Sequence, residues 1–90
     1  MSDRVDVVFV TRQTSGVARR MESVVASLQT RNRARVAVRI VDADANPRVV
    51  SRLGVQEVPA VVFLRDRRTV ARLQGRATLD ELEEILKACA

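Results

Sequence analysis

Few residues in this sequence could carry out chemistry. Histidine is absent, and cysteine occurs once, as Cys89. A Cys–His or Ser–His catalytic pair therefore cannot form within the chain. A zinc site would have only scattered carboxylates and one thiol as ligands, so we expect neither a metal nor another cofactor. One thiol also excludes an internal disulfide. We interpret Cys89 as a packing residue, with a dimer linked through its thiol as the alternative.

The segment "QTSGVARRM", residues 13–21, lies at a junction where reactive sites often occur. The preceding run, "VDVVFV", is apolar on both faces and rich in β-branched residues, which predicts a central strand. Residues 16–29 then carry apolar side chains at helical spacing, namely Val17, Met21, Val24, Val25 and Leu28. Ser15 is a suitable N-cap for this helix. The junction is thus a strand-to-helix turn without a cysteine, a histidine or an acid.

Five further elements are expected after this turn. Apolar runs bounded by turn residues predict strands over residues 36–42, 58–64 and 69–75, the second with Pro59 at its entrance. A short helix should begin at Pro47, with Asn46 as its cap. In the final segment, Thr78 and Glu81 match a capping box, so a helix is expected there. The order β-α-β-α-β-β-α predicts an α/β fold, with helices on both faces of a mixed four-stranded sheet.

The composition favours one small soluble domain that spans residues 1–90, with 47% hydrophobic residues and a formal charge of +5. The arginines are spread along the chain, which is typical of a solvated positive surface. Nucleic acid is not favoured as a partner, because the aromatic residues on which bases stack are nearly absent. No run approaches the roughly 18 apolar residues of a membrane span. We therefore expect a cytoplasmic protein that does not bind a membrane.

Two segments, "VDADANPRVVSRLGVQEVPAVVFL" and "RLQGRATLDELEEIL", resemble the thioredoxin superfamily. In that family an acidic strand end leads to an Asn-Pro helix, a Gly-Val pair and a Val-Pro pair before a strand. A later strand of the family ends at a glycine, and the final helix follows it. The resemblance covers about residues 5–86 and implies a thioredoxin-like fold without the extra N-terminal strand and helix of a full-length thioredoxin. The hairpin turn departs from the common Asp-Gly, since it reads Asp66-Arg67, and this difference predicts another turn type or a longer turn.

The resemblance also places the segment 13–21 on the family's active site, Cys-Gly-Pro-Cys. If Gly16 matches the family glycine, Ser15 stands at the nucleophilic cysteine, Val17 at the proline and Ala18 at the resolving cysteine. Thr14 replaces the usual tryptophan. Disulfide exchange needs a thiolate at the helix N-terminus and a second thiol to resolve the mixed disulfide. Ser15 and Ala18 supply neither, so these active-site positions are degenerate. Cys89 should lie about 15 Å along the last helix from its start, remote from Ser15.

The resemblance further implies that Pro59 is the family's cis-proline, which lies against the active-site turn. The backbone of the residue before it, Val58, would then pair with a bound peptide. A purely structural role for Pro59 at the strand entrance is the alternative.

The expected function is therefore a redox-inactive module that binds a protein or an extended peptide. Its groove would be formed by Thr14, Ser15, Gly16, Val17, Val58, Pro59 and Ala60. Two alternatives remain open. The chain could be a disulfide oxidoreductase whose active-site cysteines are replaced here, by substitution or by divergence. An anion could instead bind at the helix N-terminus beside Arg12, Arg19 and Arg20.

Overall fold

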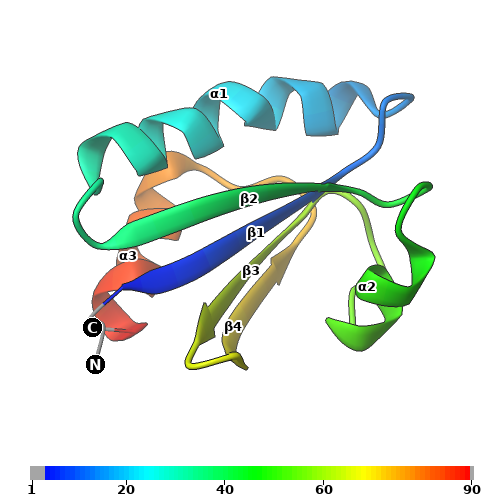
Figure 1. Ribbon diagram of the computed structural model, residues 1–90. Coiled ribbons are helices and arrows are strands. Elements are labelled where there is room, and N and C mark those ends of the chain that lie inside the picture. Colours follow the sequence, from blue (N-terminus) through cyan, green and yellow to red (C-terminus); the bar gives the residue numbers. More distant parts are fainter. Residues whose placement is uncertain (1–3, 90) are drawn as a thin grey trace.

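The structure is a computed structural model that describes residues 4–89 (Figure 1). Its elements follow the predicted order β-α-β-α-β-β-α. The strands are β1 (Val5–Thr11), β2 (Val36–Asp42), β3 (Ala60–Arg65) and β4 (Arg68–Gln74), and the helices are α1 (Gly16–Arg31), α2 (Pro47–Arg52) and α3 (Leu79–Cys89). None of the helices in this described part is long and apolar enough to cross a membrane.

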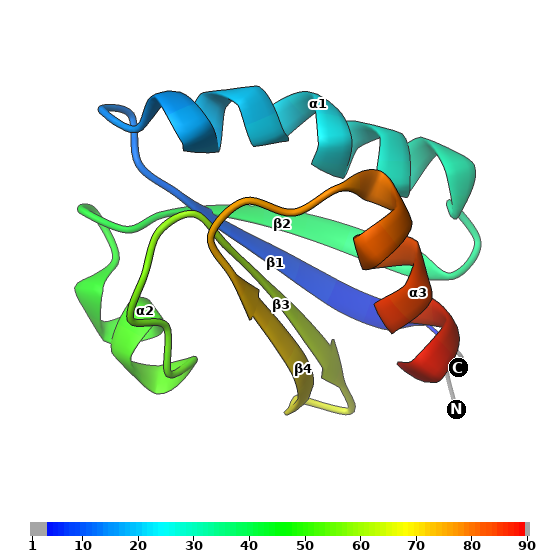
Figure 2. The ribbon, with the colours of Figure 1, turned by 180° about the vertical axis from the view of Figure 1, so that it is seen from behind.

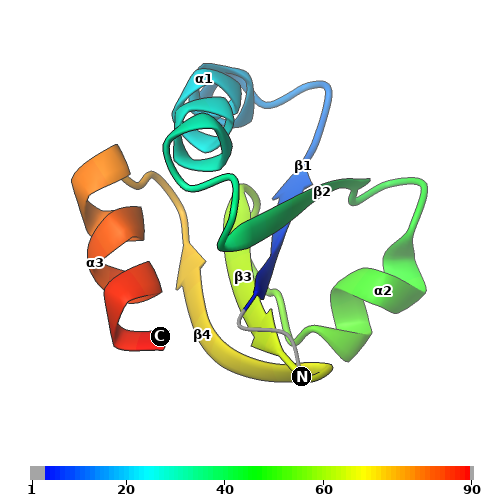
Figure 3. The same ribbon diagram turned by 60° about the vertical axis from the view of Figure 1, so that its left-hand side comes forward.

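The four strands form one sheet in the order β2-β1-β3-β4. β1 is parallel to β2 and antiparallel to β3, and β3 forms an antiparallel hairpin with β4. Figure 3 shows α1 and α3 on one side of this sheet and α2 on the other. The expected mixed sheet with helices on both faces is confirmed, and it explains why the central strands are apolar on both faces.

Two apolar clusters fill the space between the helices and the sheet. Phe9 and Phe63, both fully buried, belong to the larger cluster, which lies beneath α1 and α3. The smaller cluster joins β1 and β3 to the α2 side through Val10, Ala43, Val55, Ala60 and Val62. The buried stripe of α1 consists of Ala18, Met21, Val25 and Leu28. Val17 and Val24, which sequence spacing assigned to this stripe, are only half-buried.

The ends of the β3–β4 hairpin differ from the sequence prediction. β3 begins at Ala60 rather than at Val58, because a proline has no N–H to donate to a strand ladder. The turn has only two residues, Asp66 and Arg67, with φ of 52° and 67°. Two positive φ angles are typical of a type I′ hairpin turn. Asp-Gly typically forms this same turn. The expectation of another turn type or a longer turn is therefore wrong, although neither residue is a glycine.

Candidate functional site

The sheet topology brings three loops to the C-terminal end of β1. The antiparallel register pairs Val10 with Ala60, so the residues that precede β3 lie opposite the chain as it leaves β1. The parallel register pairs Thr11 with Asp42, which adds the loop after β2. Figure 1 shows these loops at the same end of the sheet, with the start of α1. The Ser15 turn and the segment 58–60, which are far apart in the sequence, therefore lie at one end.

Ser15 holds the turn between β1 and α1 in place. Its N–H donates to the Arg12 carbonyl at 3.0 Å, and its side-chain oxygen accepts from the Ala18 N–H at 3.1 Å. The predicted N-cap is thus confirmed. Ala18 is fully buried, and a Cβ added at Gly16 would meet nothing within 4 Å. The turn is therefore fixed on its inner side and open to solvent beside Gly16.

Arg12 is already paired within the chain. Its Nε lies 3.0 Å from Oδ1 of Asp44, and the two side chains are 42% and 66% exposed, respectively. Asp42 orders the same loop, because its side chain accepts from the Asp44 N–H at 2.9 Å. Asn46 does not cap α2 as predicted, since its side chain makes no cap hydrogen bond and its Nδ2 donates to the Asp42 carbonyl at 3.0 Å. The first turn of α1 contains no acidic residue.

The loop that enters β3 is held from β4. Val58 and Pro59 are joined by a cis peptide bond, and the Pro59 carbonyl accepts from the Gly75 N–H at 2.7 Å. The Gln74 side-chain oxygen accepts from the N–H groups of Gln56 and Glu57, at 2.6 and 3.0 Å. Sequence reasoning did not find Gln74, whose partners are 18 and 17 residues away in the chain.

Arg72 holds the start of the same loop. Its Nη1 donates to the Leu53 carbonyl at 2.8 Å. The guanidinium lies so close to Gly54, whose φ is +70°, that a Cβ there would come within 2.7 Å of Nη1. Arg72 and Gln74 are two apart in a strand, so both point to the same face of the sheet. That spacing is the only sequence signal for their shared role.

Val58 is the residue in this loop whose backbone remains open. Its N–H and C=O form no hydrogen bond within residues 4–89. The residues on both sides are held, Glu57 through Gln74 and Pro59 through Gly75. The Val58 side chain packs against the smaller apolar cluster. A donor and an acceptor are therefore presented in a fixed orientation at the same end of the sheet as the Ser15 turn.

The comparison with known proteins agrees with this geometry. The family model described as Thioredoxin matches residues 2–88 of the chain. The chain belongs to the thioredoxin family. No curated protein is similar enough in sequence to match it.

Solved thioredoxins have the same fold as this family member. It is similar to the germline-specific thioredoxin Deadhead of Drosophila melanogaster, at 27% identity and a TM-score of 0.88 over 98% of this chain and 83% of that one. The Fasciola hepatica thioredoxin has 27% identity and a TM-score of 0.88 over 99% and 84%. A mutant thioredoxin from Halobacterium salinarum has 26% identity and a TM-score of 0.87 over 97% of this chain and 74% of that one.

The one cysteine of this thioredoxin-family chain lies away from the site. The Cys89 carbonyl accepts from Arg65 Nη1 at 2.6 Å, and Arg65 is at the opposite end of β3 from Ala60. Figure 2 likewise shows the end of α3 far from the start of α1. Burial raises the pKa of the Cys89 thiol, and the charge of Arg65 partly offsets this effect. Within residues 4–89, no three His, Cys, Asp or Glu side chains lie close enough to hold a metal ion.

Proposed function

We propose that this protein is a redox-inactive member of the thioredoxin family that binds an extended segment of a partner protein. The segment would lie in the groove between residues 14–17 and 58–60 and pair its main chain with Val58. The observation that carries the proposal is that the N–H and C=O of Val58 form no hydrogen bond with the described residues 4–89, although both neighbouring residues are anchored. In strand pairing, main-chain hydrogen bonds provide affinity, and neighbouring side chains provide specificity.

The fixed conformation of Val58 favours such pairing. Gln74 and Gly75 hold the loop on either side of this residue, so little conformational freedom is lost when a peptide binds. A preorganised site gains affinity mainly because this entropic cost is smaller. The Ser15 turn is also open beside Gly16, where no atom would contact an added Cβ, so a bound segment would not be blocked there.

The chemistry at residues 15–18 supports the redox-inactive part of the proposal. The Ser15 oxygen serves as the acceptor of the helix cap. The chain has no histidine to remove its proton, and the first turn of α1 has no acidic residue. Ala18 is buried and has no functional group. Anion binding is less favoured, because one of its three arginines, Arg12, is paired with Asp44.

Peptide binding can be tested with a phage-displayed library of random peptides. Selected peptides should shift the amide resonances of Ser15 and Val58 in an NMR titration. Pro59→Ala should weaken their binding at least about tenfold, which corresponds to about 1.4 kcal/mol. Val70→Thr, at an exposed residue of β4, is the matched control and should bind as the wild type does. Shifts confined to α3, or equal binding by Pro59→Ala, would contradict the proposed groove.

Redox inactivity needs a separate measurement. In an insulin-reduction assay driven by dithiothreitol, the protein should not exceed the rate with the reductant alone. A clear rate above that blank would favour the oxidoreductase alternative. Cysteine codons at positions 15 and 18 of the natural gene would do the same.

A further inference from the structure

Among the described residues 4–89, no strand pairs with the outer edge of β2, which is a regular strand edge. All seven residues of β2 pair with β1 in unbroken register. The other edge strand, β4, pairs with β3 in a register that shifts between Phe63 and Leu64 of β3, which leaves Val70 of β4 without a partner residue in β3. Bulges of this kind hinder further strand pairing. β2 is therefore the edge that is better suited to accept another strand.

The residues of β2 that face β1 can be identified from hydrogen bonds at its two ends. The Arg35 carbonyl accepts from the Val5 N–H at 2.7 Å, and the Ala43 N–H donates to the Thr11 carbonyl at 2.9 Å. Along a strand, the backbone N–H and C=O groups of successive residues point alternately to one side and to the other within the sheet. The odd-numbered residues therefore direct their N–H and C=O groups toward β1.

The even-numbered residues direct these groups outward. In agreement, the Val36 N–H bonds to the Asn32 carbonyl in the preceding loop at 3.0 Å, and the Asp42 carbonyl accepts bonds from the loop that follows. Val38 and Ile40 lie between them. Their outward N–H and C=O groups form no hydrogen bond within the described residues 4–89. Four main-chain hydrogen bonds are thus available to an added strand.

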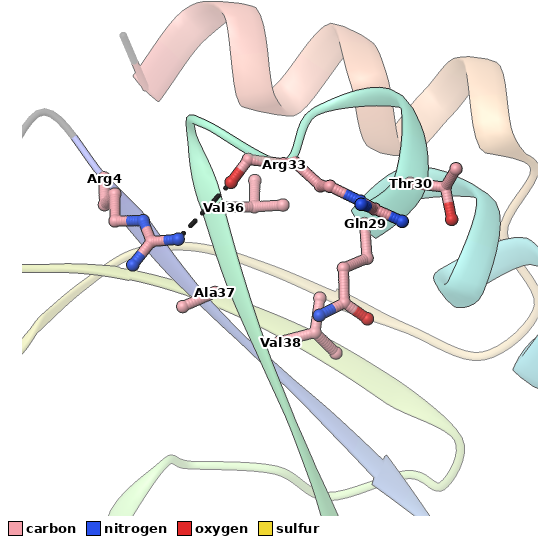
Figure 4. A pocket seen from close by; sticks show the side chains of 7 residues that line it. All are labelled: Arg4, Gln29, Thr30, Arg33, Val36, Ala37 and Val38. Carbon is pink, nitrogen blue, oxygen red and sulfur yellow. Dashed lines mark hydrogen bonds between the residues drawn. The ribbon is translucent and has the colours of Figure 1, made fainter.

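The two faces of this edge differ in character. Val36 and Val38 pack toward α1, and Ile40, on the same face, has 63% of its surface exposed. Beside them is a hollow of about 590 Å³ (Figure 4), where the Gln29 side chain extends from α1 toward Val38. On the other face, Arg39 lines a second hollow of about 460 Å³. A strand added to β2 would therefore meet an exposed apolar side chain on one face and a cation on the other.

The charges around the edge favour an acidic partner. Arg33, Arg39, Arg52 and Arg67 are among the residues that line the two hollows. Of the lining residues that the structure describes, Asp6 is the one with a carboxylate. These four arginines form no ion pair within residues 4–89. A second copy of the chain fits poorly. Two-fold antiparallel pairing across Val38 and Ile40 would place Arg39 opposite its own copy, and like charges directly opposite are destabilising.

We propose that the edge of β2 binds an extended segment of a partner protein in which apolar and acidic residues alternate. The segment would add a fifth strand across Val38 and Ile40. Because side chains alternate between the two faces of a strand, its apolar residues would lie beside Ile40 and its acidic residues beside Arg39. This interaction is separate from the Val58 groove and does not depend on it.

The probe is a blocked peptide of alternating valine and glutamate, compared with one of alternating valine and lysine. The valine–glutamate peptide should slow hydrogen exchange at the Val38 and Ile40 amides at least about tenfold, and the valine–lysine peptide should not. Arg39→Glu should reverse this preference, whereas Arg68→Glu, the same charge change on β4, should leave it unchanged. N-methylation of alternate peptide amides should abolish the protection without changing the protein.

Three outcomes would overturn the proposal. The first is slowed exchange at Val58 but not at the β2 edge. The second is an unchanged preference in a folded Arg39→Glu protein. The third is protection of Val38 and Ile40 that rises with protein concentration in the absence of peptide, since this would identify the partner as a second copy.

Discussion

The side-chain oxygen of Gln74 accepts a hydrogen bond from the backbone N–H of Glu57 at 3.0 Å. Gln74 is the last residue of β4, and Glu57 directly precedes Val58. One side chain at the edge of the sheet therefore fixes the loop that presents the open backbone groups of Val58. This contact explains how an exposed loop can hold a main-chain donor and acceptor in a constant orientation.

Gln74→Leu should loosen this loop without unfolding the protein. A hydrogen bond of this kind contributes about 0.5–1.5 kcal/mol to the free energy of unfolding, and the Gln56 and Glu57 amides can bond to water once the acceptor is lost. We expect faster hydrogen exchange at these two amides and weaker peptide binding. Gln74→Glu keeps an oxygen acceptor and should behave as the wild type. Equal exchange in Gln74→Leu and the wild type would show that the contact does not order the loop.

Ser15→Ala should lower the free energy of unfolding by about 1 kcal/mol, because the cap bond to the Ala18 N–H is lost. Ser15→Asp keeps the cap and places a negative charge at the helix N-terminus, where it is favoured, so its stability should equal or exceed that of the wild type. Urea denaturation measures both changes. Ser27→Ala, at an exposed position within α1, is the control and should not destabilise the protein. Equal losses in the Ser15 and Ser27 variants would rule out a capping role.

The double substitution Ser15→Cys with Ala18→Cys should introduce disulfide-exchange activity. A cysteine at position 15 would lie at the N-terminus of α1, which favours the thiolate. A cysteine at the buried position 18 would act as the resolving thiol. We expect insulin reduction above the reductant blank for the double variant and none for Ser15→Cys alone. Failure of a folded double variant would indicate that Val17 and Thr14 have also lost the geometry needed for exchange.

The reactivity of Cys89 should depend on folding and on pH. Burial raises the pKa of this thiol above its ordinary value in the folded protein, and the charge of Arg65 partly offsets the rise. The neutral thiol is thus favoured in the folded state, so this small contribution to stability is full below the unfolded pKa and is lost as pH rises through the folded pKa.

Alkylation by iodoacetamide provides the measurement for Cys89. The pH midpoint of the rate should be higher for the folded protein than for the protein in urea. Arg65→Gln should raise the midpoint further, whereas Arg65→Lys, which keeps the charge, should leave it near the wild-type value. A midpoint that is the same in the folded and unfolded proteins would contradict the effect of burial.

Local patterns in the sequence determined the secondary structure and two of the helix caps. Ser15 caps α1 through a bond to a residue three positions away, and Thr78 and Glu81 bond to each other's backbone at the same separation. Such contacts depend only on helix geometry, so residue types at a fixed spacing predict them. The lack of a Cys-x-x-Cys pair is likewise a property of the sequence itself.

Only the tertiary structure decided how the candidate site is held and which strand edge is open. The Gln74 side chain accepts hydrogen bonds from residues 17 and 18 positions away in the chain. The register of β3 on β4 and the turn at Asp66-Arg67 decide which residues lie close enough to form them. The open backbone of Val58 and the outward groups of Val38 follow from strand pairing as well. Pairing partners and register arise from contacts between distant segments, which residue types and local spacing do not specify.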